Sequence, residues 1–177
     1  MSEAFPELLD PRRAVDQEAR FAGDLPLSGF PRLAPMLAAR DGMATYRLAF
    51  GKDHRGQGIV RGHVSAELTV RCQRCNGMLS LTVESPLSLA LVEGLDEAAT
   101  VPEEYDPLLL EGRLLHPADL IEDELILAVP AVPRHEAGSC EAPAADADHG
   151  HGDGATEERR NPFAELAALK RDRGRTH

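Results

Sequence analysis

Apolar and polar side chains alternate without interruption in the sequence VRGHVSAELTVR, residues 60–71. Successive side chains of a β-strand point to opposite faces, so this period of two predicts a strand with one buried and one exposed face. Residues 45–50 and 79–91 repeat the pattern on either side, with Pro86 expected at an edge or a bulge. Together the three segments predict an antiparallel sheet core within residues 43–135.

Helices are expected on both sides of this core. Asp10 and Pro11 are start signals for a helix that runs to Ala22, and a second short helix is predicted over residues 31–40. Residues 1–42 are therefore predicted to form a helical segment that packs on the core. Pro117 opens a further helix, residues 117–129. The predicted fold is α+β, with an antiparallel, partly closed sheet of four to six strands and flanking helices.

The composition changes sharply after residue 135. Residues 136–160 contain no large apolar side chain, so they cannot bury enough surface to offset the entropy of ordering, and a flexible acidic linker is predicted. Residues 161–177 follow as a predicted C-terminal amphipathic arm. Phe163 and Leu166 lie on its apolar face, and Lys170 begins its basic end.

The charge balance limits the classes of function. The chain of 177 residues has 30 acidic and 19 basic side chains, a net charge of −11, and only 4% aromatic residues. These values disfavour a protein that coats nucleic acid by bulk charge or stacks single-stranded bases on aromatic side chains. No apolar run is long enough to span a membrane and no signal peptide is evident, so a cytoplasmic protein without a membrane partner is expected. No nucleophile, phosphate-loop or dinucleotide motif occurs, and we expect neither an enzyme nor a small-molecule substrate.

The cysteines are the strongest chemical signal. Cys72 and Cys75 flank a turn between two predicted strands, the geometry of a zinc knuckle, and His135 and Cys140 could complete a structural zinc site. A reduced pair without metal and a redox-active dithiol are the alternatives. The strand–turn–strand context lacks the helix N-terminus that activates thioredoxin-type cysteines.

Several motifs, taken in order, point to a known family. They are residues 70–75 with the C-Q-R-C sequence, residues 101–107, residues 119–130, residues 132–135, Cys140 and residues 161–170. In this order and spacing they resemble the YceD family, the large ribosomal RNA subunit accumulation proteins of bacteria and plastids. The resemblance implies a non-enzymatic factor needed for synthesis, processing or stability of 23S ribosomal RNA during large-subunit assembly.

An acidic protein can serve ribosomal RNA in two ways. Acidic faces could hold a basic ribosomal protein or assembly factor, or a local basic patch could touch 23S rRNA directly; the charge balance favours the protein partner. The candidate partner-binding residues are Glu103, Glu104, Asp119, Glu122, Asp123, Glu124, Arg71, Arg74, Phe163, Leu166 and Lys170. The acids near residue 119 are also typical of the first turns of a capped helix. The arginines are also typical of an ordinary protein surface. A zinc- or thiol-dependent redox or sensor protein using Cys72 and Cys75 remains the alternative function.

Overall fold

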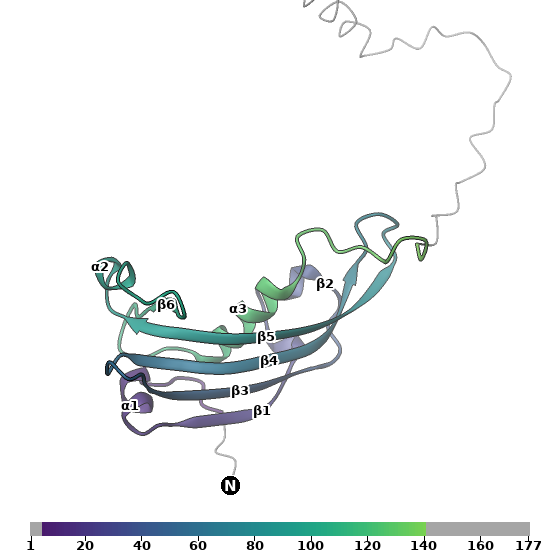
Figure 1. Cartoon of the computed structure of the whole chain (residues 1–177). Helices are drawn as coiled ribbons and strands as arrows, with labels where there is room; N and C mark the ends of the chain where they lie inside the picture. The colour runs from purple at the N-terminus through teal and green to yellow at the C-terminus, as the bar shows by residue number, and fades with distance from the viewer. Residues whose placement is uncertain (1–4, 141–177) are drawn as a thin grey trace, which may run out of the picture. The chain divides into compact units, whose positions relative to one another are not determined.

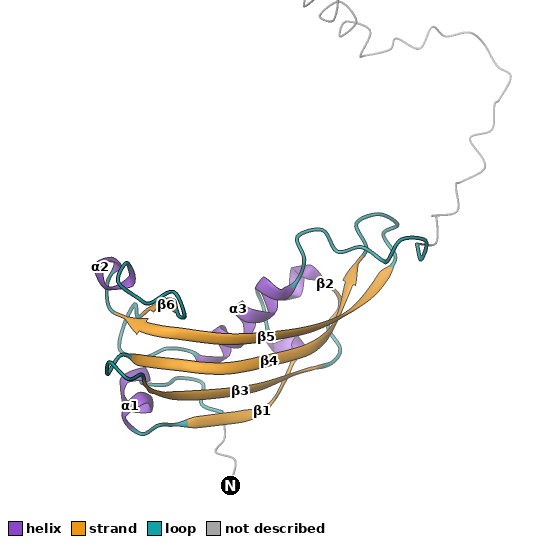
Figure 2. Cartoon of the chain, in the orientation of Figure 1, coloured by secondary structure: helices purple, strands orange, loops and turns teal. Residues whose placement is uncertain are grey.

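The computed structural model describes residues 5–140, which form one six-stranded sheet with helices on its buried face (Figure 1). Strands contribute more residues than helices to the described chain, as Figure 2 shows. The elements are α1 (Pro11–Asp16), β1 (Arg20–Pro26), β2 (Leu37–Ala39), β3 (Met43–Lys52), β4 (Gly58–Arg71), β5 (Met78–Val92), α2 (Leu95–Ala98), β6 (Asp106–Leu109) and α3 (Pro117–Ala128), with short 3-10 turns at Leu27–Gly29 and Ala34–Met36. The α+β class is thus confirmed.

The sheet is open, with strand order β1-β3-β4-β5-β6 and β2 paired to β4. β3, β4 and β5 are the three alternating segments predicted from the sequence, and they pair antiparallel in register. β6 differs from the prediction because it runs parallel to β5. The pairing of β5 with β6 covers Leu89–Val92 only. Pro86 lies outside it, in the stretch of β5 that pairs with β4 alone, so on its other side Pro86 is at an edge of the sheet.

The core lies on one face of the sheet. Val60, Val64, Leu68 and Val70 of β4 are buried there, as the alternation predicts, and they cluster with side chains of α1 and α3. Gly62 lies on the same face of β4. A Cβ atom at this position would lie 2.4 Å from the carbonyl oxygen of Arg47, so β3 and β4 can approach each other there only because residue 62 has no side chain.

The prediction of a helical segment over residues 1–42 is wrong for most of its length. Asp10 does cap α1, accepting from the Arg13 N–H at 3.2 Å, but the helix ends at Asp16. Glu18 then has a positive φ of 49°, and β1 follows. Antiparallel pairing with β3 buries Phe21 and so overrides the weak local helix signal.

The helix predicted over residues 31–40 is also wrong. The chain makes a 3-10 turn at Ala34–Met36 and then enters β2. Pro35 explains the difference, because its ring would clash with the carbonyl of Pro31 inside an α-helix that began at Pro31.

The helix predicted over residues 117–129 is confirmed as α3, which buries Leu120, Ile121 and Leu125 against β4 and β5. No helix within residues 5–140 is both long and apolar enough to cross a membrane. Most of the predicted linker and the whole predicted arm, with Phe163, Leu166 and Lys170, lie outside the described residues.

Candidate metal centre

The turn between β4 and β5 positions two thiols. The Cys72 N–H donates to the Gly77 carbonyl and the Asn76 N–H to the Cys72 carbonyl, both at 2.9 Å, so the chain reverses within six residues. Asn76 adopts a positive φ of 59°, a conformation that asparagine tolerates better than most residues. Cys72 is 1% exposed and Cys75 is partly buried beside it.

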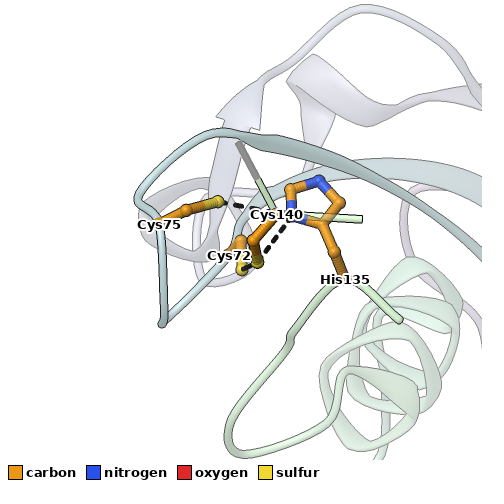
Figure 3. A group of neighbouring side chains, drawn as sticks. All are labelled: Cys72, Cys75, His135 and Cys140. Carbon is orange, nitrogen blue, oxygen red and sulfur yellow. Dashed lines mark hydrogen bonds between the residues drawn. The ribbon is translucent and has the colours of Figure 1, made fainter. Parts of the chain in front are cut away.

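The segment after α3 supplies two further donors. A main-chain hydrogen bond from the Gln73 N–H to the Pro133 carbonyl (2.8 Å) joins this segment to the turn. His135 and Cys140 then face the turn cysteines, as Figure 3 shows. The structure therefore brings together all four residues that the sequence suggested as metal ligands, with one ligand atom from each lying within 4.8 Å of the others.

The individual distances describe a compact cluster. Cys72 Sγ lies 3.7 Å from Cys140 Sγ, Cys75 Sγ lies 3.4 Å from His135 Nδ1, and Cys140 Sγ lies 3.6 Å from the same nitrogen. All three cysteines are free thiols. His135 Nε2 lies 2.9 Å from the Met78 carbonyl oxygen. Because a carbonyl can only accept, Nε2 carries a proton and donates it to Met78, and Nδ1 is the ring nitrogen that faces the sulfur atoms.

Two of the thiols have a lowered pKa. Burial raises the pKa of Cys72, but the N–H groups of Cys75, His135 and Arg74 outweigh it and lower that pKa to about 5. Burial also raises the pKa of Cys140, whereas hydrogen bonds from Arg74 and His135 lower it below the usual value. Arg74 Nε donates to Cys140 Sγ at 3.0 Å. A thiolate at neutral pH is the form that binds metal.

The other two groups respond to that negative charge. The Gly77 N–H lowers the pKa of Cys75, but burial and the neighbouring cysteines raise it above its ordinary value. The hydrogen bond with Cys140 and that with the Met78 carbonyl raise the pKa of His135. Thiols held this close share negative charge, which a cation at the centre of the cluster would stabilise.

The chemistry open to such a cluster follows from its ligands. Three thiolates and one imidazole are soft and borderline donors suited to Zn²⁺, and four protein ligands leave no position for substrate. The thiols lie in a strand–turn–strand context, without the helix N-terminus of thioredoxin-type sites.

The acidic residues proposed for partner binding divide into two groups. Glu103 and Glu104 are exposed between α2 and β6. On α3, Asp119 is exposed, Asp123 pairs with Arg32, and Glu124 accepts from Ser85.

Glu122 corrects the sequence analysis, because it is 2% exposed and cannot belong to a partner-binding surface in this fold. Its Oε1 accepts from the main-chain N–H groups of Arg32 (2.6 Å) and Leu33 (3.0 Å), and its Oε2 accepts from Arg32 Nε (3.0 Å). Its role is structural, because these hydrogen bonds fix Arg32 and Leu33, in the irregular segment that precedes β2, against α3.

The basic residues proposed for partner binding, Arg71 and Arg74, make hydrogen bonds within the hairpin and to the segment after α3. Arg71 Nη1 donates to the Asn76 carbonyl at 3.3 Å, and Arg74 Nη2 donates to the carbonyls of His135 and Glu136.

Sequence reasoning missed a basic cluster on the exposed face of the sheet. The register places Arg20, Ala49 and Arg61 in one row across β1, β3 and β4. Arg47 and His63 are direct neighbours in the next row. We call Arg20, Arg47, Arg61 and His63 the outer-face basic cluster. The alternation in the sequence shows which residues of a single strand are exposed. Only the pairing register between strands places these four residues next to one another.

Comparison with known proteins identifies the family. Residues 60–170, more than half of the chain, match the family model described as "Large ribosomal RNA subunit accumulation protein YceD". A protein of Haemophilus influenzae with the same description is 32% identical over 169 residues, which cover 94% of this chain and 96% of that protein. No solved structure matches significantly. By both measures, this chain is a member of the YceD family of large ribosomal RNA subunit accumulation proteins.

Proposed function

We propose that this protein is a ribosome-biogenesis factor that supports the synthesis, processing or stability of 23S ribosomal RNA and acts by binding rather than by catalysis. One observation carries the proposal: the similarity to the Haemophilus influenzae large ribosomal RNA subunit accumulation protein extends over 94% of this chain. We expect the protein to act in the cytoplasm, where ribosomal subunits assemble.

The favoured partner is a basic ribosomal protein or assembly factor of the large subunit. Residues 93–106 include Glu103 and Glu104, both exposed, and the exposed acids Asp96 and Glu97 of α2. No salt bridge involves these four side chains within residues 5–140. These four acids, on a protein of net charge −11, would steer a basic partner toward them, and salt would weaken this attraction.

Direct contact with 23S rRNA is a second candidate, favoured by the outer-face basic cluster. Arg61 Nη2 donates to Tyr105 Oη at 2.6 Å, and its guanidinium lies 5.4 Å from the centre of that ring. In the described part of the chain, no carboxylate pairs with Arg20, Arg47 or Arg61. Like charges gathered on neighbouring strands repel each other, and a bound phosphate would relieve that repulsion.

A surface pocket lies beside α1. The pocket has a volume of about 760 Å³ and is lined by Leu9, Asp10, Arg13, Phe21 and Arg113, among others. The Arg13 N–H and the Arg113 guanidinium hold the pKa of Asp10 below its usual range. A general acid at neutral pH needs a raised pKa, so Asp10 is unsuited to that role.

A pull-down from cell lysate at two salt concentrations tests the proposal. We expect the full-length protein to retain large-subunit precursors, identified through both their proteins and their RNA, at low salt and to lose them at high salt. Absence of large-subunit components at low salt would contradict the binding model.

Matched charge variants separate the two partners. If a basic protein binds residues 93–106, Glu103→Gln with Glu104→Gln reduces capture, whereas Arg47→Gln with Arg61→Gln leaves it unchanged. If RNA binds the outer-face basic cluster, the arginine variant loses binding to purified 23S rRNA. Each lost phosphate contact then reduces the slope of log affinity against log salt by about 0.7–0.9.

The redox alternative is tested in cells. Cys72→Ser with Cys75→Ser should lower 23S rRNA levels if these residues support the fold that performs biogenesis. Normal 23S levels together with loss of a disulfide-exchange activity would favour the redox function instead.

A further inference from the structure

We propose that the open edge of β5, residues 80–86, binds an extended basic segment of a ribosomal protein or assembly factor, which adds one strand to the sheet. The inference rests on the proposed function, because it takes the basic protein partner from there and names the surface and the binding mode. β5 pairs with β4 along Met78–Ala90 but with β6 along Leu89–Val92 only (Figure 1). Within residues 5–140, no strand pairs with the other side of residues 80–86.

The direction of the main-chain groups along β5 follows from its pairing. The Leu110 N–H donates to the Val92 carbonyl at 2.8 Å, so the main-chain groups of Val92 point away from β4. Every second residue of a regular strand points its N–H and C=O to the same side, and the register with β4 is unbroken from residue 78 to residue 90. Two observations agree with this direction. The Met78 carbonyl lies 2.9 Å from His135 Nε2, and Pro86 has no N–H to donate to β4.

The open edge therefore presents unpaired main-chain donors and acceptors. They are the N–H groups of Ser80, Thr82 and Glu84 and the carbonyls of these residues and of Pro86. In the described part of the chain, no main-chain hydrogen bond outside the sheet reaches these groups, and the four side chains are exposed. At about 3.3 Å per residue the edge is about 20 Å long, which suits an added strand of about six residues. An extended peptide would satisfy the free groups by main-chain hydrogen bonds.

The charge beside the edge selects the chemistry of the partner. α3 packs against β5, and Ser85 of β5 donates to Glu124 of α3. β5 contains one acidic residue and α3 four, and neither contains Lys or Arg. Glu122 is buried and Asp123 pairs with Arg32. The remaining acids have no Lys or Arg partner within residues 5–140, and they are Glu84, Asp119 and Glu124. A segment rich in Lys or Arg is therefore attracted to this edge.

The same features argue against a second copy of the chain as the occupant. Natural sheets use charged residues and proline on open strands to avoid pairing edge to edge. Two copies of β5 would bring acid against acid at Glu84, whereas a basic segment would be attracted there. Pro86 removes one donor near the end of the open edge and leaves those of Ser80, Thr82 and Glu84 free to pair.

The surroundings extend the surface beyond the main chain. Leu127 lies three residues after Glu124, so the two share one side of α3, and Leu127 is 78% exposed. Side chains on one face of an added strand would cover Leu127. The added strand would lie in line with β6, which begins opposite Leu89, and the exposed acids Glu103 and Glu104 precede β6. One basic partner could therefore occupy the open edge and reach the acidic residues before β6.

Amide hydrogen exchange of the full-length protein tests the proposal without any substitution. The ¹⁵N-labelled protein is mixed with individually purified basic proteins of the large ribosomal subunit, and exchange is followed by nuclear magnetic resonance. With a protein that binds, exchange at the Ser80, Thr82 and Glu84 amides should slow by about tenfold or more. Binding without this protection would overturn the proposal and leave the proposed function standing. If no large-subunit protein binds while purified 23S rRNA does, the open-edge proposal fails together with the protein-partner role.

A proline substitution at the edge provides a second test. Thr82→Pro removes one outward-facing N–H without removing a donor from the ladder with β4, and it should weaken binding by about tenfold. The matched control Thr82→Ala keeps the N–H and should bind within about twofold of the native protein. Circular dichroism and Tm establish that both variants are folded. Equal affinities of the two folded variants would overturn the proposal.

Charge variants test the choice of a basic partner and do not alter the main chain. Glu84→Gln with Glu124→Gln should weaken binding and reduce its dependence on salt. The matched control, Glu18→Gln with Asp41→Asn, removes the same number of exposed acids away from β5 and α3 and should bind as the native protein does. Equal losses of affinity in the two pairs would show that only net charge matters and would overturn the assignment of the partner to this edge.

Discussion

Glu122 offers the sharpest test of how this fold is held together. It is the only buried charged side chain within residues 5–140, and it accepts three hydrogen bonds from Arg32 and Leu33. Leu33 is fully buried, so its main-chain N–H has no access to water if the carboxylate is removed. Glu122→Ala is therefore expected to destabilise the protein strongly, whereas Glu122→Gln should be tolerated better.

The magnitudes follow from the contacts. Alanine leaves the N–H of the buried Leu33 without an acceptor, which costs about 1–3 kcal/mol. It also removes the hydrogen bonds of the carboxylate with Arg32, at about 1–2 kcal/mol, so a total loss of about 2–5 kcal/mol is expected. Glutamine keeps Oε1 for both main-chain donors and loses only the contact with Arg32 Nε. The Arg32 side chain is 49% exposed and can turn to water, so a loss of about 1–2 kcal/mol is expected.

Urea unfolding followed by far-ultraviolet circular dichroism measures these differences, with the midpoint and the slope fitted for each variant. Hydrogen exchange at the Leu33 amide reports the local contact, and its protection should fall in Glu122→Ala. The control is Asp123→Ala, which removes an exposed ion pair with the same arginine and should cost less than about 1 kcal/mol. Equal losses for Glu122→Ala and Asp123→Ala, with unchanged Leu33 protection, would refute the reasoning.

Two further predictions concern the sheet and α1. Gly62→Ala should lower the free energy of unfolding by about 1–3 kcal/mol, because the added Cβ would meet the Arg47 carbonyl. Gly51→Ala is the control and should have little effect, because its Cβ would meet nothing within 4 Å. Similar Tm values for the two variants would contradict this prediction. Asp10→Asn keeps a capping oxygen but removes the negative charge. In the native protein the Arg13 N–H and Arg113 lower the pKa of the Asp10 carboxyl group. A lowered pKa stabilises the fold above the unfolded value of about 4 and loses that contribution as the pH falls further. The Tm difference from the native protein should therefore shrink below about pH 4, and a constant difference would exclude this charge effect.

The central strands could be predicted from the sequence because their signal is local. In β4 the alternation from Val60 to Arg71 needs no partner to be recognised, since one face must be buried whichever strand lies beside it. The same holds for α3, where Pro117 marks the start and the apolar spacing marks the buried side.

The candidate metal centre could be predicted only in part. The spacing of Cys72 and Cys75 within a turn is a local pattern that indicates paired thiols. Their approach to His135 and Cys140 depends on the path of the chain after α3, including the hydrogen bond from Gln73 to Pro133. The sequence nominated these residues, but tertiary structure brought their donor atoms together.

What the sequence alone determined was therefore the set of elements with strong periodicity, the paired cysteines of the turn and the family. Tertiary structure decided the rest: that residues 20–26 pair with β3 instead of continuing a helix, that Glu122 is buried, and that Arg20, Arg47, Arg61 and His63 share one face. The physical reason is that periodicity records which side of an element is buried, whereas pairing, hydrogen bonding and charge clustering depend on neighbours distant in the chain.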